Sequence, residues 1–408
     1  MSTIEKHDMT QGKILLPLVS FTIPLVLGNL FQLTYNAADS VIVGKYVGEQ
    51  ALAAVGTSTP IMNIAILLIS GMCMGASVLM SSQYGAKDYD TLSRQISTTM
   101  LAGCGFSVVF SLLMLLLANP VLRLIRVPET AIPEAAAYLR IIFMGLIFTF
   151  MYNFLANTMR ALGDSKTPLY FLVTSAFLNI FGDLFFVVVL RWGVAGSAIA
   201  TVCSEGLCCL LCGIYIKKKI PLLCLGKKWW VFDKSLLGKT VSYGSTSAMQ
   251  QVCLQLGKLI IQSVVNTQGV AVMAAFTAVN RVDDFAYTPQ QNIGHAMTTF
   301  LAQNKGAGHK ERMKKGFQTG LLIELVYSIG LFCVIWGLAP QIMTLFAEDG
   351  DAQVVSLGIS YLHLISWMYI LPGLTNGVQG FFRGIGDLKV TLYSTFMNMF
   401  GRVVAVFV

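Results

Sequence analysis

The sequence predicts an all-α polytopic membrane protein, and composition gives the first reason. Charged residues make up 12% of the 408 residues and hydrophobic residues 55%, whereas soluble domains carry about 25% charged residues. Continuous apolar runs long enough to cross a bilayer, about 20 residues each, recur along the whole chain. This pattern excludes soluble enzymes, secreted modules and disordered scaffolds. It also excludes a β-barrel, because the apolar runs are continuous rather than alternating.

Eleven membrane-spanning helices are predicted from these runs. Several of them exceed the minimum length of a span, which allows tilts or kinks within the bilayer. The predicted spans cover residues 14–43, 51–81, 95–118, 136–161, 167–190, 193–216, 240–266, 270–302, 316–340, 354–382 and 389–408.

Positive charge is concentrated on one side of these spans. With the N-terminus placed in the cytoplasm, most of the 28 Lys and Arg residues fall in inner segments, including the basic segment 217–239. Short cytoplasmic loops of membrane proteins carry such an excess. We therefore interpret the net charge of +8 as membrane topology in the cell (inner) membrane, and expect no nucleic-acid partner.

The two halves of the chain share a sequence repeat. Residues 160–170 match 383–393 at Arg, Gly, Asp, Lys, Leu and Tyr, and Asn179-Ile-Phe-Gly182 matches Asn398-Met-Phe-Gly401. The first copy holds six spans, and an even number returns the chain to the same side of the membrane. This predicts two six-helix lobes as parallel repeats, related by a pseudo-twofold axis along the membrane normal.

The repeat also predicts the domain boundaries. We expect an N-lobe at residues 1–216 with spans one to six, a cytoplasmic basic linker at 217–239, and a C-lobe at 240–408 with spans seven to eleven. The partner of the sixth span is absent from this chain. The expectation is that the chain is a fragment or that its twelfth helix is lost.

Polar residues within the predicted spans of the N-lobe share helix faces, since they are spaced by three or four residues. They are Tyr35, Asn36 and Asp39 in the first span, Asn179 and Asp183 in the fifth, and Thr201 in the sixth. A charge at bilayer depth costs about 2.5 to 3.5 kcal/mol on insertion scales. Two carboxylates brought together at low dielectric take a proton or a cation. This predicts a Na⁺- or H⁺-responsive site; the alternative is that Asp39 and Asp183 are ordinary interface residues at water-accessible span ends.

The C-lobe does not repeat these charges. The repeat places Ile260 at the level of Asp39, and Arg402 at the position of Asp183. Its polar residues are instead Lys258, Arg281, Asp283 and Asp284. They either line a shared cavity or form a local ion-pair network, and the sequence leaves both interpretations open.

Other residues within the spans have a predicted structural role. Pro24 removes one backbone hydrogen bond in the first span and is a candidate hinge. Gly71 and Gly75 form a GxxxG pattern, which favours close packing of helices. Glu205 and Glu324 are expected to face water or a neighbouring helix.

Five short motifs occur in a fixed order along the chain: Tyr35–Gly44, Ala51–Gly56, Arg160–Asp164, Asn179–Asp183 and Gln303–Ala307. In order, spacing and duplication they resemble the prokaryotic multidrug and toxic compound extrusion (MATE) transporters, over essentially the whole chain. The resemblance implies twelve spans in two lobes, and export of cationic lipophilic compounds in exchange for Na⁺ or H⁺.

The resemblance also implies site residues. An N-lobe cation site would use Asp39, Asn179, Asp183 and Thr201, and Pro24 matches a bend-forming proline. One branch of the family uses further carboxylates on the seventh and tenth spans. Here the seventh span carries Lys258 and no carboxylate, and the apolar part of the tenth has none. This departure favours coupling in the N-lobe.

The expected function is secondary active multidrug efflux by alternating access, with no enzymatic activity and no cofactor. Na⁺ or H⁺ is the expected coupling ion, with any Na⁺ held by Asp39 and Asp183. The expected partners are small cationic amphiphilic drugs and the lipid bilayer, and the protein is expected to act as a monomer.

Short patterns in the sequence also match two other functions. Lys258 and Arg281 offer some support for a lipid-linked precursor flippase of the same superfamily, but the acidic N-lobe residues argue against it. Gly384-Ile-Gly-Asp387 matches the GxGD motif of intramembrane aspartyl proteases. The same turn recurs at residues 161–164, which favours a duplicated loop over a protease motif.

Overall fold

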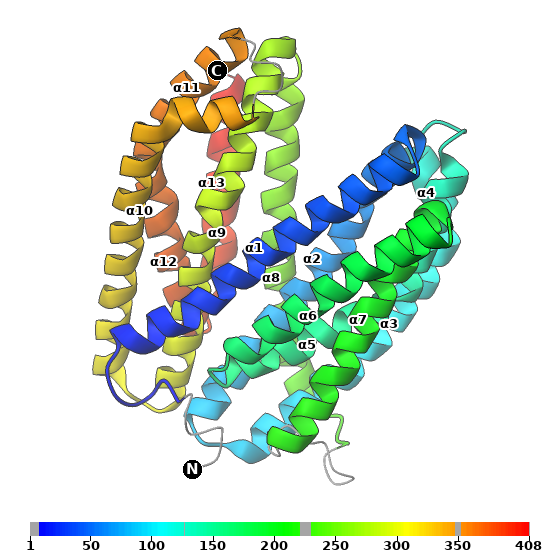
Figure 1. Ribbon diagram of the computed structural model, residues 1–408. Helices are drawn as coiled ribbons and strands as arrows, with labels where there is room; N and C mark the ends of the chain where they lie inside the picture. Colours follow the sequence, from blue (N-terminus) through cyan, green and yellow to red (C-terminus); the bar gives the residue numbers. More distant parts are fainter. Residues whose placement is uncertain (1–7, 126, 221–229, 347–351, 408) are drawn as a thin grey trace. The chain divides into compact units, whose positions relative to one another are not determined.

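The computed structural model describes residues 8–125, 127–220, 230–346 and 352–407 (Figure 1), and no β-strand occurs in these ranges. The predicted all-α class is therefore confirmed. The helices are α1 (Leu15–Tyr46), α2 (Glu49–Gly85), α3 (Tyr89–Leu124), α4 (Ile132–Met144), α5 (Leu146–Ala161), α6 (Lys166–Asp183), the π-helix η2 (Leu184–Val189), α7 (Gly193–Lys219), α8 (Lys234–Val265), α9 (Val270–Gly306), α10 (Lys310–Phe346), α11 (Ala352–Ser366), the 3-10 turn η6 (Trp367–Tyr369), α12 (Ile370–Gly384) and α13 (Leu388–Phe407).

Each predicted span corresponds to one helix or to consecutive helices separated by a short break. By length and composition, seven helices of the described ranges qualify as spans, and α4 with α5 adds an eighth. The chain is therefore a multi-pass membrane protein. Helices α8 and α9 are long enough, but they are more polar than this criterion admits. Helix α8 is rich in Gln, Ser and Thr, and α9 carries Arg281, Asp283 and Asp284.

Two spans are broken for identifiable reasons. Helices α4 and α5 meet at Gly145 with a bend of 46°. A Cβ on Gly145 would lie 2.4 Å from a methyl group of Val202, so glycine allows the bend to pack against α7. Between α11 and α12, Pro372 cannot donate to the carbonyl of Met368, and the chain forms the 3-10 turn η6 at this point.

The internal repeat is visible in the backbone. Helices α2 and α9 begin after glycines with left-handed φ angles, 115° at Gly48 and 98° at Gly269. Each is followed by a capping alanine, Ala86 or Ala307, and both alanines have a φ of −73° and a ψ of −7°. The sequence repeat therefore marks equivalent turns of two equivalent helices.

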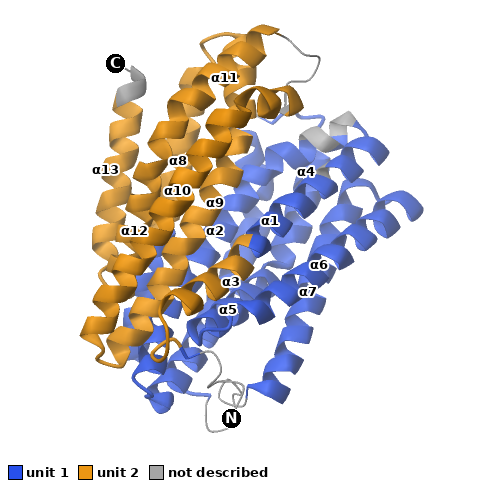
Figure 2. Cartoon of the chain, turned by 60° about the vertical axis from the view of Figure 1, so that its left-hand side comes forward, with its two compact units in different colours: residues 1–8, 27–248 blue, residues 9–26, 249–408 orange. Residues whose placement is uncertain are grey.

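The chain divides into two compact units (Figure 2). Unit 1 comprises residues 1–8 and 27–248, and unit 2 comprises residues 9–26 and 249–408. The division falls within α1 and α8, whereas the sequence placed the lobe boundaries at 216 and 240. Residues 221–229 of the predicted linker lie outside the described residues.

The GxxxG pattern packs α2 against the start of α8 within unit 1. A Cβ on Gly71 would lie 2.5 Å from Cα of Ala248, and a Cβ on Gly75 would lie 2.5 Å from the backbone of Tyr243. Only a residue without a side chain fits between these backbones. The prediction of close helix packing at this pattern is therefore confirmed.

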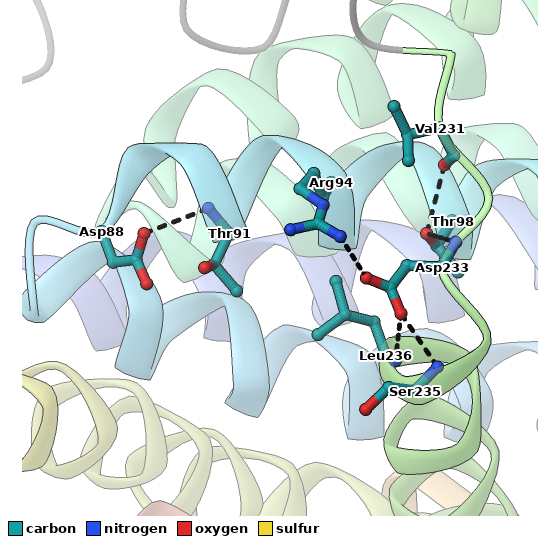
Figure 3. Close-up of polar contacts among 8 residues, drawn as sticks. All are labelled: Asp88, Thr91, Arg94, Thr98, Val231, Asp233, Ser235 and Leu236. Atoms are coloured by element: carbon teal, nitrogen blue, oxygen red, sulfur yellow. Dashed lines mark hydrogen bonds and ion pairs between the residues drawn. The ribbon is translucent and has the colours of Figure 1, made fainter.

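The segment after the undescribed part of the linker is fixed to α3. Backbone groups of Val231 and Asp233 hydrogen bond the Thr98 hydroxyl, at 3.2 and 3.1 Å (Figure 3). The Asp233 carboxylate accepts a hydrogen bond from Arg94 at 2.5 Å and receives the backbone N–H groups of Ser235 and Leu236 at the start of α8.

Candidate functional site

Small residues bring α6 and α7 close together in unit 1. A Cβ on Gly182 would lie 3.0 Å from Cβ of Ala200, and a Cβ on Gly196 would lie 3.1 Å from the backbone of Phe186. Helices with glycine at the contact approach closely enough for polar side chains to bond between them. The polar residues of α6 and α7 lie at this contact.

A chain of hydrogen bonds links the first span to α6 through α7. Asn179 Nδ2 donates to the Thr201 hydroxyl at 3.2 Å, and that hydroxyl donates to the backbone carbonyl of Ser197 at 3.2 Å. The Ser197 hydroxyl donates to Oδ1 of Asp39 at 2.6 Å. Three helices thus contribute to one polar cluster, which we call the Asp39–Asp183 cluster (Asp39, Asn179, Asp183, Ser197 and Thr201).

Asp183 is the least satisfied member of this cluster. Its side chain is fully buried, and no described residue donates a hydrogen bond to either carboxylate oxygen. It lies beside Asp39, close enough for the two carboxyls to interact. The buried Oδ1 of Asn179 also lacks a donor. The cluster therefore holds more acceptor oxygens than hydrogens to satisfy them.

The helix changes form directly after Asp183. Residues Leu184–Val189 form the π-helix η2, which closes with a hydrogen bond of 2.9 Å from the Leu190 N–H to the Phe185 carbonyl. Single π turns inside α-helices occur frequently at functional sites. Here the wider turn follows the buried Asp183 directly, so the backbone departs from a regular α-helix next to this carboxyl.

Further polar groups surround the cluster. Tyr35 and Tyr138 lie within electrostatic range of Asp39 and of Glu205. Glu205 Oε2 accepts a hydrogen bond of 2.5 Å from the Thr149 hydroxyl, so this carboxyl faces a neighbouring helix. Asn36, one residue after Tyr35 on α1, is exposed.

The donor set of the cluster fits a proton or a monovalent cation. Two carboxyls, an amide oxygen and two hydroxyls are oxygen ligands of the kind that hard cations prefer, and the carboxyls can also take a proton. Within the described residues, no group of three or more His, Cys, Asp or Glu side chains is arranged to hold a metal ion. The chemistry of the cluster therefore differs from that of a transition-metal centre.

The structure brings together all four residues that the sequence predicted for this site, and adds Ser197. Sequence reasoning did not select Ser197, although it lies four residues before Thr201 on the same helix face. The same i, i+4 rule that selected Asn179 and Asp183 would have found it. A buried Asp183 also disfavours the alternative of a water-accessible span end for this residue.

The predicted cavity residues of the C-lobe separate into different environments. Lys258 Nζ lies 3.0 Å from Asp284 Oδ1, and both side chains are exposed, at 63% and 54%. Asp283 instead accepts a hydrogen bond from the Tyr369 hydroxyl, and Arg281 is exposed. The Lys258–Asp284 contact joins α8 to α9. It supports the ion-pair interpretation for these two residues.

Pro24 lies inside α1, which remains a single helix from Leu15 to Tyr46. The change from unit 2 to unit 1 falls after residue 26, close to this proline. Before it, Leu18 and Phe21 pack with unit 2 residues. The hinge role of Pro24 stays a prediction.

Comparison with known proteins agrees with this architecture. The MatE family profile matches residues 24–185 and again 247–408. The chain is 32% identical to "Probable multidrug resistance protein YpnP" of Bacillus subtilis (strain 168), over 95% of this chain and 86% of that protein. It is 29% identical to "Probable multidrug resistance protein YoeA" of the same organism, over 93% of this chain and 82% of that protein.

A solved structure described as the outward-facing conformation of a multidrug resistance MATE family transporter of the MOP superfamily has the same fold. It superposes with a TM-score of 0.90 at 22% identity, over 98% of this chain and 89% of that chain. The duplicated profile match corresponds to the two equivalent halves of the backbone. The chain is a member of the MatE family of multi-pass membrane transporters.

Proposed function

We propose that this protein is a secondary active multidrug exporter that exchanges cationic lipophilic compounds for Na⁺ or H⁺. The names of its relatives support multidrug transport. The observation that carries the coupling proposal is the buried Asp183 carboxyl, which lies beside Asp39 and lacks any described donor.

The mechanism follows from the charge of the Asp39–Asp183 cluster. With both carboxyls ionised the cluster carries two negative charges at low dielectric, which is costly. A proton or a Na⁺ ion bound there removes part of this cost. Asn179 and Thr201 supply neutral oxygens to a bound ion, and Ser197 fixes the orientation of Asp39.

Exchange requires that ion and drug favour different conformations. A cationic drug is stabilised by the ionised cluster, and binding of the coupling ion removes that negative charge. The ion therefore favours release of the drug, and loss of the ion restores affinity for the next one. Such competition is sufficient for antiport by alternating access, because each ligand shifts the equilibrium by its differential affinity.

The remaining parts of the proposal concern the setting of this cycle. We propose that the protein lies in the cell membrane with a cytoplasmic N-terminus, on the basis of its Lys and Arg distribution. We also propose that it acts as a monomer. The bend of α1 at Pro24 is proposed to accompany ion binding, since Asp39 lies on the same helix.

The test is ethidium efflux from vesicles that contain the whole protein, with Na⁺ and pH gradients imposed separately. Asp39→Asn is expected to abolish the efflux that either gradient drives in the wild type. Asp164→Asn is the matched control, because Asp164 is also buried but its Oδ1 accepts the backbone N–H groups of Lys166 and Thr167, which an Asn oxygen also accepts.

Each outcome has a distinct meaning. Efflux driven by one gradient identifies the coupling ion. Efflux unchanged by Asp39→Asn would retain an exporter but remove the Asp39–Asp183 cluster as its coupling site. Absence of efflux under both gradients, from folded wild-type protein, would favour the flippase alternative.

A further inference from the structure

A second buried carboxyl without a described hydrogen-bond donor lies in unit 2, remote in sequence from the cluster described above. Glu324 of α10 is fully buried, and no described residue donates a hydrogen bond to either of its carboxylate oxygens. The bilayer supplies no water to satisfy such a group, and an isolated buried charge is costly. This carboxyl needs either a cation or a proton.

The surroundings of Glu324 are polar and converge on one point. Gly373 of α12 faces it, and a Cβ there would lie 2.7 Å from Ser328 Oγ, 3.2 Å from Gln290 Nε2 and 3.4 Å from Glu324 Oε2. Helices α9 and α10 therefore direct polar atoms to the space that Gly373 of α12 leaves open. We call Gln290, Glu324, Ser328 and Gly373 the Glu324 cluster.

The hydrogen bonds of Gln290 fix which of its atoms are available. Its Nε2 donates to Ser328 Oγ at 3.0 Å and to the Tyr369 carbonyl at 2.8 Å. A flipped amide would set its oxygen against that carbonyl, so the orientation is determined by the acceptor. Gln290 Oε1 is then left without a donor, like both oxygens of Glu324.

The Ser328 hydroxyl does not supply the missing hydrogen. It donates to the backbone carbonyl of Glu324 at 2.7 Å, and lies 3.4 Å from the Tyr369 carbonyl. The cluster thus contains three buried acceptor oxygens without a donor. A protonated carboxyl is a donor as well as an acceptor, so a single proton changes this balance.

A metal cation fits the cluster less well than a proton. The amide nitrogen of Gln290 is one of the three polar atoms nearest the space beside Gly373, and its hydrogens repel a cation there. The cluster also has one carboxyl, whereas the Asp39–Asp183 cluster has two. The geometry therefore favours a neutral carboxylic acid over a bound Na⁺ ion.

Several other titratable groups of the packed elements have partners of their own. Tyr327, on α10 itself, lies within electrostatic range of Glu324, and its hydroxyl donates to the Ala286 carbonyl at 3.0 Å. The remaining contacts are Asp283 of α9 with Tyr369 of η6, Arg383 of α12 with His295 of α9 at 3.4 Å, and His363 of α11 with the Trp336 carbonyl at 3.3 Å. Residues 15–26 are the part of α1 that belongs to unit 2, and they include no charged residue.

We propose that Glu324 is a proton-binding site of the C-terminal half and is protonated in the conformation described here. This inference stands independently of drug transport, because protonation can be measured on the resting protein. It gives the two halves of the chain different cation chemistry: a pair of carboxyls in unit 1 and a single neutral acid in unit 2.

Infrared spectroscopy of the whole protein in lipid membranes tests the proposal, since a protonated carboxyl has a carbonyl stretching band that a carboxylate lacks. The wild type minus Glu324→Gln difference spectrum at neutral pH is expected to show this band. Glu205→Gln is the matched control, because Glu205 is also a glutamate within a span but accepts a hydrogen bond from the Thr149 hydroxyl. It must leave the Glu324 band unchanged.

A measurement on the wild type alone guards against misfolding of the variant. Labelling glutamate with ¹³C must shift the band, whereas labelling aspartate must not. Absence of the band, or its persistence in Glu324→Gln, would overturn the proposal. A band that appears only when Na⁺ is removed at constant pH would also overturn it, because Glu324 would then be a Na⁺ ligand.

Discussion

The Asp39–Asp183 cluster and the Glu324 cluster both hold carboxyls within membrane-spanning helices, but these carboxyls differ in number and in the hydrogen bonds that they accept. In unit 1 two carboxyls lie side by side, and one of them, the half-buried Asp39, receives a hydroxyl donor from Ser197. In unit 2 one carboxyl is fully buried and receives none. The first arrangement is suited to a site that exchanges ions with water, and the second to a proton held inside the helices.

This difference exists despite a shared backbone. Gly48 and Gly269 start equivalent helices with similar φ angles, as Gly163 and Gly386 adopt similar left-handed turns, at 90° and 85°. The turns that define the repeat are therefore retained while its buried charges differ. Internal symmetry predicts helix geometry here, but it does not predict where an ion or proton binds.

The largest expected effect comes from neutralising each cluster separately. Asp183→Asn is expected to lower gradient-driven efflux by about tenfold or more, within the range typical of coupling between two ligands.

Glu324→Gln mimics a permanently protonated acid, so it is expected to lower pH-driven efflux and to spare any efflux that Na⁺ drives. Parallel vesicle assays under the two gradients measure both. Equal losses in both variants under both gradients would show that the clusters are not distinct.

The second comparison adds one methyl group at a close contact in each unit, next to Ser197 in unit 1 and within the Glu324 cluster in unit 2. In Gly196→Ala the new Cβ meets the backbone of Phe186 at 3.1 Å, and backbone cannot rotate away. In Gly373→Ala the contact of 2.7 Å is with the Ser328 hydroxyl, which can rotate. We expect a loss of unfolding free energy of about 1–3 kcal/mol for the first and about 1 kcal/mol for the second.

Thermal unfolding in detergent measures these two losses. Gly337→Ala is the control, because nothing lies within 4 Å of its Cβ on α10. Gly373→Ala is also expected to shift the infrared band of Glu324, since the carboxyl environment changes. The reverse order of destabilisation would contradict the assignment of a rigid contact to unit 1.

A smaller effect is expected from the hydroxyl that orients Asp39. Ser197→Ala removes a hydrogen bond to a carboxyl, and bonds to charged groups contribute about 1.5–3 kcal/mol. Because Asp39 is half-buried, we expect the low end of this range, or about a tenfold change in coupling-ion affinity. Ser204→Ala is the control, since Ser204 of α7 donates only to the Thr201 carbonyl at 2.8 Å. The ion concentration at half-maximal efflux is the readout, and equal values in both variants would remove Ser197 from the cluster.

The sequence predicted the helices well because their signals are local. Apolar runs, Pro and Gly positions, and the repeat with Gly48 and Gly269 all depend on neighbouring residues. The same holds for the face that Asn179 and Asp183 share. That these residues meet Asp39 was predictable only from the family resemblance, since helix pairing depends on contacts such as Gly182 with Ala200.

The Glu324 cluster could not be predicted in this way. Glu324 is a lone carboxyl in an apolar helix, a pattern that is equally typical of a residue facing water. Its burial depends on Gly373 and Gln290, which lie on other helices. The pairing of Lys258 with Asp284 could not be predicted from local sequence either, because it depends on how α8 and α9 meet.

The smallest expected effect concerns two carboxylates just before α3 and α8, which provide a reference for those of the two clusters. The backbone N–H of Leu236 holds the pKa of Asp233 below its ordinary value. The side chain and the backbone N–H of Thr91 lower the pKa of Asp88 in the same way, and Figure 3 shows the backbone contact. A lowered folded-state pKa gives stability that is present above the unfolded value, about 4, and is lost as pH falls through the folded value. Asp233→Asn is expected to lower the unfolding temperature near neutral pH more than Asp88→Asn, because Asp233 also binds Arg94. Both differences should vanish in strong acid, where the wild-type carboxyls are protonated. A difference in unfolding temperature that persists in strong acid would mean that the loss of stability comes from side-chain shape rather than from charge. The buried clusters, in contrast, are expected to respond to charge at neutral pH.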